Sequence, residues 1–139
     1  AEAASRLGEY VRYGSVLDPT VREILILSTA KELNVEYEWA HHEVEARKVG
    51  LSDSTIEAIR SGRAPMGIPA KEGVFAQAAR ELVHNSRLTD RTYQAVEHLL
   101  SPMQLIDLIL VVGYYSMLAK VLKTLDVELD EGIERTPLD

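Results

Sequence analysis

The chain has 139 residues, a formal net charge of −7 and a sequence pI near 5.1, and 46% of its residues are hydrophobic. This length predicts a single domain over residues 1–139, and the acidic surface argues against nucleic acid as a partner because it repels phosphate. The chain contains no cysteine, which excludes disulfides, thiol catalysis and thiolate metal ligands within it.

Helix signals follow one another along the chain, and no strand-like alternation of useful length separates them. The predicted helices cover residues 3–12, 19–33, 36–49, a short stretch that starts within 51–54 and ends at Gly62, and then residues 71–85, 91–100 and 102–125. Asn34 is expected to end the second helix in a left-handed conformation. Ser54 and Glu57 have capping-box spacing, and Thr89 or Asp90 should cap the sixth helix. The predicted fold class is therefore all-α, with about seven helices.

The last predicted helix is the longest, and it is also the most apolar. It opens with the capping-box pattern of Ser101 and Gln104, and Asp107 is the only charged residue between Leu105 and Ala119. As a membrane span it is short and interrupted, so we expect no membrane association. We predict instead a helix that is buried on most sides, partly by neighbouring subunits. Residues 63–70 are expected to form a loop, and residues 126–139 an acidic, extended tail.

The most informative stretch is the third predicted helix, which contains the densest cluster of protonatable side chains. At about 100° per residue, Glu38 and His42 fall on its apolar stripe, one turn apart. That stripe also contains Val35, Trp39, Ala46 and Val49. Burying a carboxylate and an imidazole costs free energy unless they are paired, and the i, i+4 spacing allows that pairing.

A third polar residue, Glu23, lies in the nearly all-apolar second helix. The second and third helices are joined by a very short connection, so they should pack antiparallel and bring Glu23 toward His42. Two carboxylates would raise the pKa of the histidine, whereas burial would lower it. The sequence leaves that balance open, but such a group can titrate near neutral pH.

Three interpretations of Glu23, Glu38 and His42 remain open at this point. They can form a catalytic acid–base site, where perturbed titratable groups tend to cluster. They can form a structural polar cluster that holds two helices in register. They can also ligate a metal, with His41 as a fourth ligand, although adjacent histidines diverge by about 100° on a helix. We favour the first interpretation, with no metal and no cofactor.

Several further residues are candidates for substrate binding, namely His41, Trp39, Tyr114 and Tyr115. Simpler interpretations exist for some of them: His41 can form a surface pair with Glu45, and Trp39 can belong to the core or to a subunit interface. Of the two tyrosines, one is expected to line the pocket and the other an interface, because a buried phenol needs a partner for its hydroxyl. A substrate carboxylate would also need a cation, and the candidates are Arg22, Lys31, Arg63, Lys71 and Arg91.

The pattern of residues 22–27, 36–42 and 46–53, with residues 112–117 and 127–130 near the end, resembles the carboxymuconolactone decarboxylase family. This family belongs to the wider alkyl hydroperoxidase D-like group, and the resemblance covers roughly residues 18–132. It implies an all-helical protomer in an alkyl hydroperoxidase D-like bundle that assembles as trimers or hexamers.

In the peroxidase branch of that group the third helix carries Cys-x-x-Cys-x-x-x-His, and the helix before it carries a glutamate. The resemblance places this histidine on His42 and the glutamate on Glu23, while the two cysteine positions fall on Val35 and Glu38. Thiol-based peroxidase activity is therefore expected to be absent.

The resemblance and the acid–base cluster together predict a carboxymuconolactone decarboxylase-like enzyme. We expect cofactor-free decarboxylation or isomerisation of a small carboxylated lactone or keto acid from aromatic breakdown. His42 would transfer the proton, and Glu38 and Glu23 would fix its tautomer or share that proton. We expect a cytoplasmic homo-oligomer that binds a small molecule. The alternative is a non-catalytic binding or assembly protein on the same scaffold.

Overall fold

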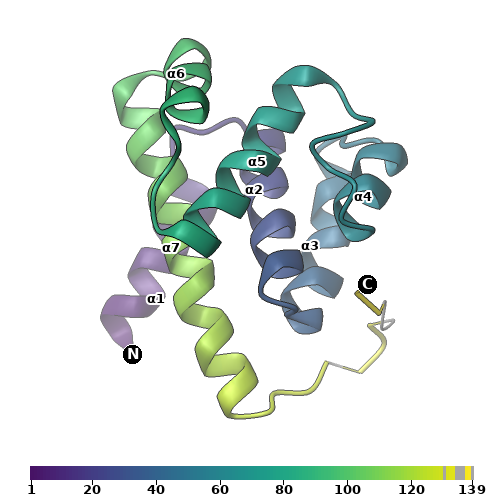
Figure 1. Ribbon diagram of the computed structural model, residues 1–139. Coiled ribbons are helices and arrows are strands. Elements are labelled where there is room, and N and C mark those ends of the chain that lie inside the picture. Colours follow the sequence, from purple (N-terminus) through teal and green to yellow (C-terminus); the bar gives the residue numbers. More distant parts are fainter. Residues whose placement is uncertain (130, 134–136, 139) are drawn as a thin grey trace.

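The computed structural model describes residues 1–129, 131–133 and 137–138, and within these residues it contains seven α-helices, one π-helical turn and no strand (Figure 1). The elements are α1 (Glu2–Glu9), the π-helical turn η1 (Tyr10–Gly14), α2 (Pro19–Glu32), α3 (Glu36–Lys48), α4 (Asp53–Arg60), α5 (Ala70–Asn85), α6 (Asp90–Leu99) and α7 (Pro102–Thr124). The predicted all-α class is confirmed.

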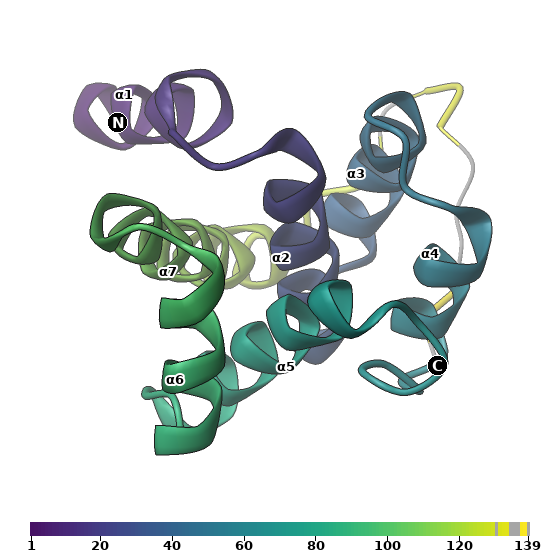
Figure 2. The same cartoon turned by 90° about the horizontal axis from the view of Figure 1, so that it is seen from above.

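The helix α2 lies at the centre of the bundle and packs against α3, α4, α5 and α7 (Figures 1 and 2). Its buried apolar residues are Val21, Ile24, Leu25, Ile26, Leu27 and Ala30. Because these residues cover nearly the whole circumference, the helix can be buried on most sides, as the sequence predicted. The core therefore holds Glu23 of α2, which is 2% exposed, in a largely dehydrated environment.

Most helix boundaries follow the local signals in the sequence. Asn34 has φ 54°, in the left-handed region, and the Ser101–Gln104 capping box forms at the start of α7. Thr89, rather than Asp90, caps α6. The predicted capping box of Ser54 and Glu57 is wrong: α4 begins at Asp53, two residues earlier than that pattern implies, and Ser52 is its N-cap.

The first helix differs from the prediction, because its α-helical part ends at Glu9 and continues as the π-helical turn η1. This turn is held against α7 by the buried carboxylate of Asp107. Asp107 accepts hydrogen bonds from the Tyr10 hydroxyl at 2.9 Å, the Ser15 hydroxyl at 2.7 Å and the Val16 backbone N–H at 3.1 Å. These bonds join the beginning of the chain to its last helix.

In the single chain the helix α7 is exposed on one side, and its predicted burial by neighbouring subunits stays a prediction. One face carries partly exposed apolar side chains, namely Met103, Ile106, Ile109, Leu110, Met117 and Val121. Among the described residues, α7 is the one helix that is long and apolar enough to cross a membrane, a property that core helices of soluble proteins share. The opposite face contributes Leu108, Val111, Val112 and Tyr115 to the core.

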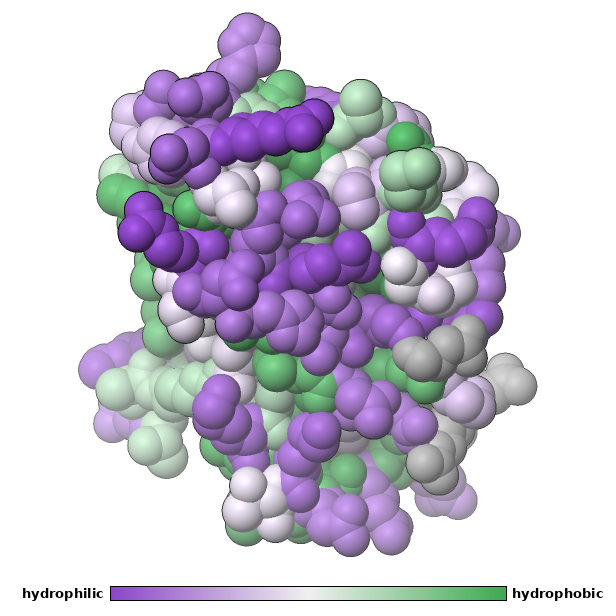
Figure 3. All heavy atoms as spheres, viewed as in Figure 1, coloured by the Kyte–Doolittle hydropathy of each residue, from purple (hydrophilic) through white to green (hydrophobic). Residues whose placement is uncertain are grey.

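The C-terminal segment is only partly regular, in line with the predicted tail, although residues 130, 134–136 and 139 lie outside the described part. Residues 127–129 have no regular secondary structure. Further on, Leu138 packs against the core and Arg60 donates a hydrogen bond to the Pro137 carbonyl at 3.3 Å. The face of the molecule in Figure 3 is mainly hydrophilic, with hydrophobic side chains in scattered patches.

Candidate functional site

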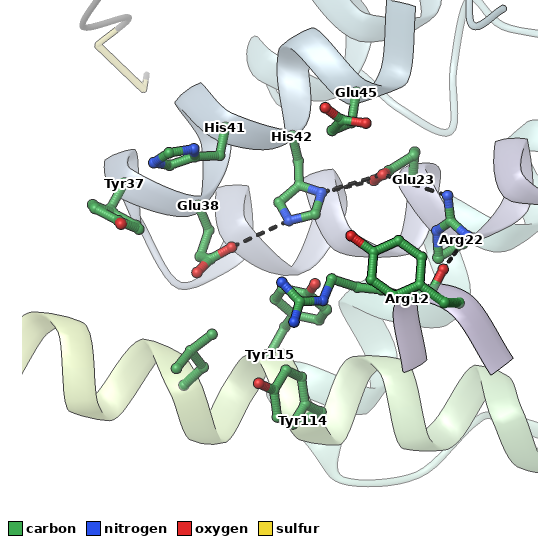
Figure 4. Close-up of a pocket in the computed structure, with 12 residues that line it drawn as sticks. Arg12, Arg22, Glu23, Tyr37, Glu38, His41, His42, Glu45, Tyr114 and Tyr115 are labelled. Carbon is green, nitrogen blue, oxygen red and sulfur yellow. Dashed lines mark hydrogen bonds and ion pairs between the residues drawn. The ribbon is translucent and has the colours of Figure 1, made fainter. Parts of the chain in front are cut away.

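A pocket of about 350 Å³ lies between η1, α2, α3 and α7 (Figure 4). It is lined by Arg12, Tyr13, Arg22, Glu23, Tyr37, Glu38, His41, His42, Glu45, Tyr114, Tyr115 and Leu118. Three successive elements, η1, α2 and α3, therefore meet the distant helix α7 at one cavity. Its volume is in the lower part of the range that is usual for small-molecule sites.

The pocket wall contains the histidine that the sequence singled out, and it is held by both predicted glutamates. Nδ1 of His42 lies 2.9 Å from Oε2 of Glu23, and Nε2 lies 3.4 Å from Oε2 of Glu38. All three residues are buried, with exposed fractions of 8%, 2% and 7% for His42, Glu23 and Glu38. The structure thus brings the three predicted residues together beside an open cavity.

This contact depends on the short turn between α2 and α3. Asn34 adopts the left-handed conformation, and the Val35 backbone N–H donates to the Ala30 carbonyl at 2.9 Å. The turn reverses the chain, so α2 and α3 run in opposite directions and Glu23 faces His42. The antiparallel arrangement that the sequence suggested therefore accounts for a pair separated by 19 residues.

Opposing effects act on the pKa of His42. Burial lowers it, whereas the hydrogen bonds and charges of Glu23 and Glu38 raise it, and the result is a pKa of about 9. At neutral pH the side chain is therefore an imidazolium that donates from both ring nitrogens. A buried, positively charged imidazole beside a cavity is suited to give a proton to a bound molecule.

Two tyrosines of α7 contribute to the wall of the same pocket. Tyr115 packs edge-to-face on His42, with ring centroids 5.3 Å apart, and on Tyr114 at 5.2 Å. Burial, with the nearby charge of Glu38, raises the pKa of Tyr115, so its hydroxyl stays protonated. Tyr114 also lines the pocket, and its hydroxyl lies against Gly8, where an added methyl group would collide with it. Both tyrosines border the pocket, contrary to the predicted division between pocket and interface.

The other two candidates for substrate binding occupy different positions. His41 lines the pocket, with its ring 4.6 Å from that of Tyr37. Trp39, predicted as a substrate-binding candidate, does not line the pocket: it is 0% exposed and belongs to the hydrophobic core. The helix turns Trp39 toward the interior, while Glu38 and His42 border the cavity.

Two arginines reach the pocket, and only one of them was among the predicted cations. Arg22 lies 3.9 Å from Oε1 of Glu23, and its Nη1 donates to the Arg12 carbonyl at 2.7 Å. Arg12, from the π-helical turn, was missed because the prediction treated this part of the chain as an ordinary short helix. The remaining candidates, Lys31, Arg63, Lys71 and Arg91, do not line this pocket. A weak signal for Arg12 was its place between two tyrosines just before Gly14.

The metal interpretation gains no support from this geometry. Within residues 1–129, 131–133 and 137–138, no group of three or more His, Asp or Glu side chains is arranged to hold a metal ion. Instead, each ring nitrogen of His42 faces one carboxylate in a hydrogen-bonding contact.

The site therefore lies in an all-helical bundle, with a histidine of α3 beside a glutamate of the neighbouring α2. The model of the carboxymuconolactone decarboxylase family matches residues 1–81, and the chain belongs to this family. The matched residues include Glu23, Glu38 and His42, and they end before the two tyrosines of α7. None of the curated proteins compared with the chain matches it.

Two solved structures with similar folds support the same class. An uncharacterised peroxidase-related protein from Silicibacter sp. TM1040 superposes with a TM-score of 0.83 at 15% identity, over 95% of this chain and 71% of that protein. A protein of unknown function from Agrobacterium tumefaciens, ATU0492, named there as a candidate antioxidant defence protein AhpD, gives a TM-score of 0.76 at 14% identity. That match covers 93% of this chain and 89% of the other. At these identities the likeness concerns the fold.

Proposed function

We propose that the protein catalyses cofactor-free acid–base chemistry on a small carboxylated lactone or keto acid, with decarboxylation as the main reaction. The observation that carries this proposal is a buried imidazolium held between two carboxylates at the wall of an open pocket. Membership of the carboxymuconolactone decarboxylase family supports it. Isomerisation would use the same proton transfer without loss of carbon dioxide.

Decarboxylation next to an unsaturated lactone needs two things from the protein. When the bond to the carboxylate breaks, carbon dioxide leaves and the electron pair moves into the conjugated lactone, which becomes a dienolate. The negative charge on the dienolate oxygen must be stabilised, and a carbon atom must then receive a proton. The overall reaction consumes one proton and releases one molecule of carbon dioxide.

His42 is the group that supplies the proton. Its Nδ1–H is fixed by the short contact with Glu23 at 2.9 Å, while Nε2 is held more loosely by Glu38 at 3.4 Å. The Nε2 proton is therefore the one to transfer, and Glu23 keeps the ring oriented while it does so. The neutral imidazole then regains a proton from solvent, beside the carboxylate of Glu38.

Tyr115 is suited to stabilise the dienolate oxygen. Its raised pKa keeps the hydroxyl protonated, and the ring packs edge-to-face on His42 at the pocket. A neutral phenol in a partly dehydrated pocket donates a hydrogen bond without adding a charge that would need compensation. The proton donor from α3 and the hydrogen-bond donor from α7 thus lie side by side, where both can reach one substrate.

Peroxide reduction by thiols is not part of this proposal. Both similar structures carry names that refer to peroxidase or antioxidant proteins, yet the 139 residues of this chain contain no cysteine. The position equivalent to the second thiol in the family resemblance holds Glu38, which contacts His42.

The test is an assay of carbon dioxide release from 4-carboxymuconolactone and from related β-keto acids, run beside a peroxide-reduction assay. Wild type should release carbon dioxide and should not reduce peroxide. His42→Gln should reduce kcat by about 100-fold or more, the size of a lost general acid. Turnover by His42→Gln at the wild-type rate, or no turnover of any such substrate by wild type, would favour the alternative of a non-catalytic binding or assembly protein.

We propose also that the protein is a homo-oligomer, a trimer or a hexamer, in which the exposed apolar face of α7 meets another subunit. That face carries Ile106, Ile109 and Met117, each more than two-fifths exposed in the single chain. Light scattering that gives the mass of one chain at micromolar concentration would contradict this proposal.

A further inference from the structure

Arg12 lies on the π-helical turn η1 at the mouth of the pocket. Proton transfer by His42 does not explain why the pocket contains this arginine. Its side chain lines the same pocket as His42, Glu38 and Tyr115 (Figure 4). The side chain is steered by a hydrogen bond from Nε to the Gly8 carbonyl at 3.2 Å. The ring of Tyr13 lies beside it, with Cζ 5.6 Å from the ring centroid.

The two arginines of the pocket differ in what they already bind. Arg22 is committed to protein groups, since it is near Glu23 at 3.9 Å and donates to the Arg12 carbonyl at 2.7 Å. Among the described residues, by contrast, no carboxylate lies within 4.0 Å of the Arg12 guanidinium. Its two terminal nitrogens are therefore available to an anion that enters the pocket, and a guanidinium matches a carboxylate in two parallel hydrogen bonds.

The position of Arg12 is built into the fold, although the residue itself is exposed. The hydroxyls of Tyr10 and Ser15, on either side of it in sequence, both donate to Asp107, which is 2% exposed. Gly8 packs closely against Tyr114, where a side chain would not fit. These contacts fix the turn on α7, so the guanidinium is presented at one place relative to His42.

We propose that Arg12 is the residue that recognises the carboxylate of the substrate that does not react. This inference rests on the proposed function for the position of the reacting carbon, near His42. Pairing of Arg12 with the leaving carboxylate would stabilise the charge that decarboxylation must disperse, and that would slow the reaction. Arg12 is therefore a specificity-determining residue for the second carboxylate.

The test is a binding measurement that does not depend on turnover. The probes are muconolactone, which keeps a single carboxylate on the lactone, and its methyl ester, which keeps the ring and loses the charge. Both are titrated by isothermal calorimetry into wild type, Arg12→Gln and Arg12→Lys. The matched control is Arg91→Gln, because Arg91 lines a separate cavity.

We expect wild type to bind the acid at least tenfold more tightly than the ester, the usual size for a charge-assisted pair. Arg12→Gln should weaken the acid about tenfold and the ester less than twofold. Arg12→Lys should be intermediate, because it keeps the charge and loses the planar fork. Arg91→Gln should bind both probes as wild type does. Far-ultraviolet circular dichroism and an unchanged Tm verify that each variant is folded.

The proposal is overturned if Arg12→Gln weakens acid and ester equally, if it weakens neither, or if wild type does not distinguish the acid from the ester. It is also overturned if wild type binds neither probe at millimolar concentration. A failure of the proposed reaction looks different: wild type would bind the acid through Arg12 and yet release no carbon dioxide from 4-carboxymuconolactone. If the proposed reaction is correct and the function of Arg12 is not, decarboxylation would proceed with the same KM in Arg12→Gln as in wild type.

Discussion

The molecule buries carboxylates beside two different cavities. The groups that hydrogen-bond to these carboxylates differ, and this difference separates the proposed acid–base site from a cluster that only supports the fold. On α2 and α3, Glu23 and Glu38 contact the titratable ring of His42. On α5, Glu81 is 5% exposed and accepts hydrogen bonds only from neutral groups among the described residues. These donors are the Thr92 hydroxyl at 2.6 Å, the Thr89 backbone N–H at 2.7 Å and the Gln77 amide at 2.9 Å.

The two clusters also differ in what they hold in place. Glu81 accepts hydrogen bonds from the backbone N–H of Thr89, the N-cap of α6, and from the hydroxyl of Thr92 in its first turn, so it attaches the start of that helix to α5. Its cavity, at about 470 Å³, is larger than the 350 Å³ pocket of His42. The choice of the smaller pocket as the proposed active site therefore rests on the titratable partner of its buried carboxylates and not on cavity size.

The same substitution in both clusters gives the largest contrast. Glu23→Gln removes the charge that holds the Nδ1 proton of His42 and should reduce kcat for decarboxylation by about 100-fold, as loss of an orienting carboxylate does. Glu81→Gln should leave kcat within threefold of wild type. Steady-state kinetics on the two purified variants provide the measurement. Equal losses in both variants would remove the distinction between a chemical and a structural carboxylate.

A second contrast is the pH dependence of stability, in which the two clusters act in opposite directions. The pKa of His42 is raised in the folded protein to about 9, from 6.5 for the free side chain. Its stabilisation is complete below pH 6.5 and is lost as the pH rises to 9, with a total of about 3 kcal/mol. For Glu81, burial raises the pKa, but the hydrogen bonds from Thr92, Thr89 and Gln77 lower it more. Its stabilisation is therefore present above the unfolded pKa and is lost in acid.

Urea unfolding of wild type between pH 2 and pH 10 measures both effects. His42→Gln should flatten the curve between pH 6.5 and 9, where the groups that face this side chain are Glu23, Glu38 and Tyr115. Glu81→Gln should flatten the acid side alone. An alkaline slope that persists in His42→Gln would show that another group causes it.

Truncation of the Glu81 side chain should lower the stability of the fold without a change in catalysis. Glu81→Ala leaves the Thr92 hydroxyl and the Thr89 N–H without their acceptor and should lower the free energy of unfolding by about 2–3 kcal/mol. Glu97→Ala on the surface of α6 is the matched control and should change stability by about 0.5 kcal/mol or less. Glu81→Ala with wild-type stability would contradict the role of this residue at the start of α6.

The smallest expected effect concerns the hydroxyl of Tyr115 in the His42 pocket. Tyr115→Phe keeps the edge-to-face contact with His42 and removes only the hydrogen-bond donor, so kcat should fall about tenfold with KM nearly unchanged. Tyr93→Phe, on the exposed part of α6, serves as the control. If Tyr115→Phe has wild-type kcat, the ring has a packing function and its hydroxyl does not take part.

The residues that were predicted correctly are those whose partners are close in sequence or follow from a short turn. Glu38 and His42 are four residues apart on one helix, and the turn at Asn34 brings Glu23 to them. Caps such as Ser101 and Gln104 are equally local. Such contacts depend on helix geometry alone, so the sequence was sufficient to predict them.

The missed features depend on contacts between distant parts of the chain. The π-helical turn that presents Arg12 is stabilised by Asp107, which is 97 residues from its partner Tyr10. Glu81 had no distinctive local pattern, because its donors on α6 become neighbours only after folding. Trp39 shares the stripe of His42 on the helix, and the packing of α3 against the core decided which of the two reaches the cavity.

The bond network around Asp107 has a consequence for how the protein can be divided. Residues 19–48 form a helical hairpin that holds Glu23, Glu38 and His42. The phenol and the guanidinium of the pocket, however, come from opposite ends of the polypeptide, and Asp107 fastens those ends together. A hairpin transplanted into another bundle would carry the proton donor without the means to select its ligand. Changes in ligand preference among relatives of this protein can therefore arise in η1 and α7, while the hairpin with Glu23, Glu38 and His42 stays the same.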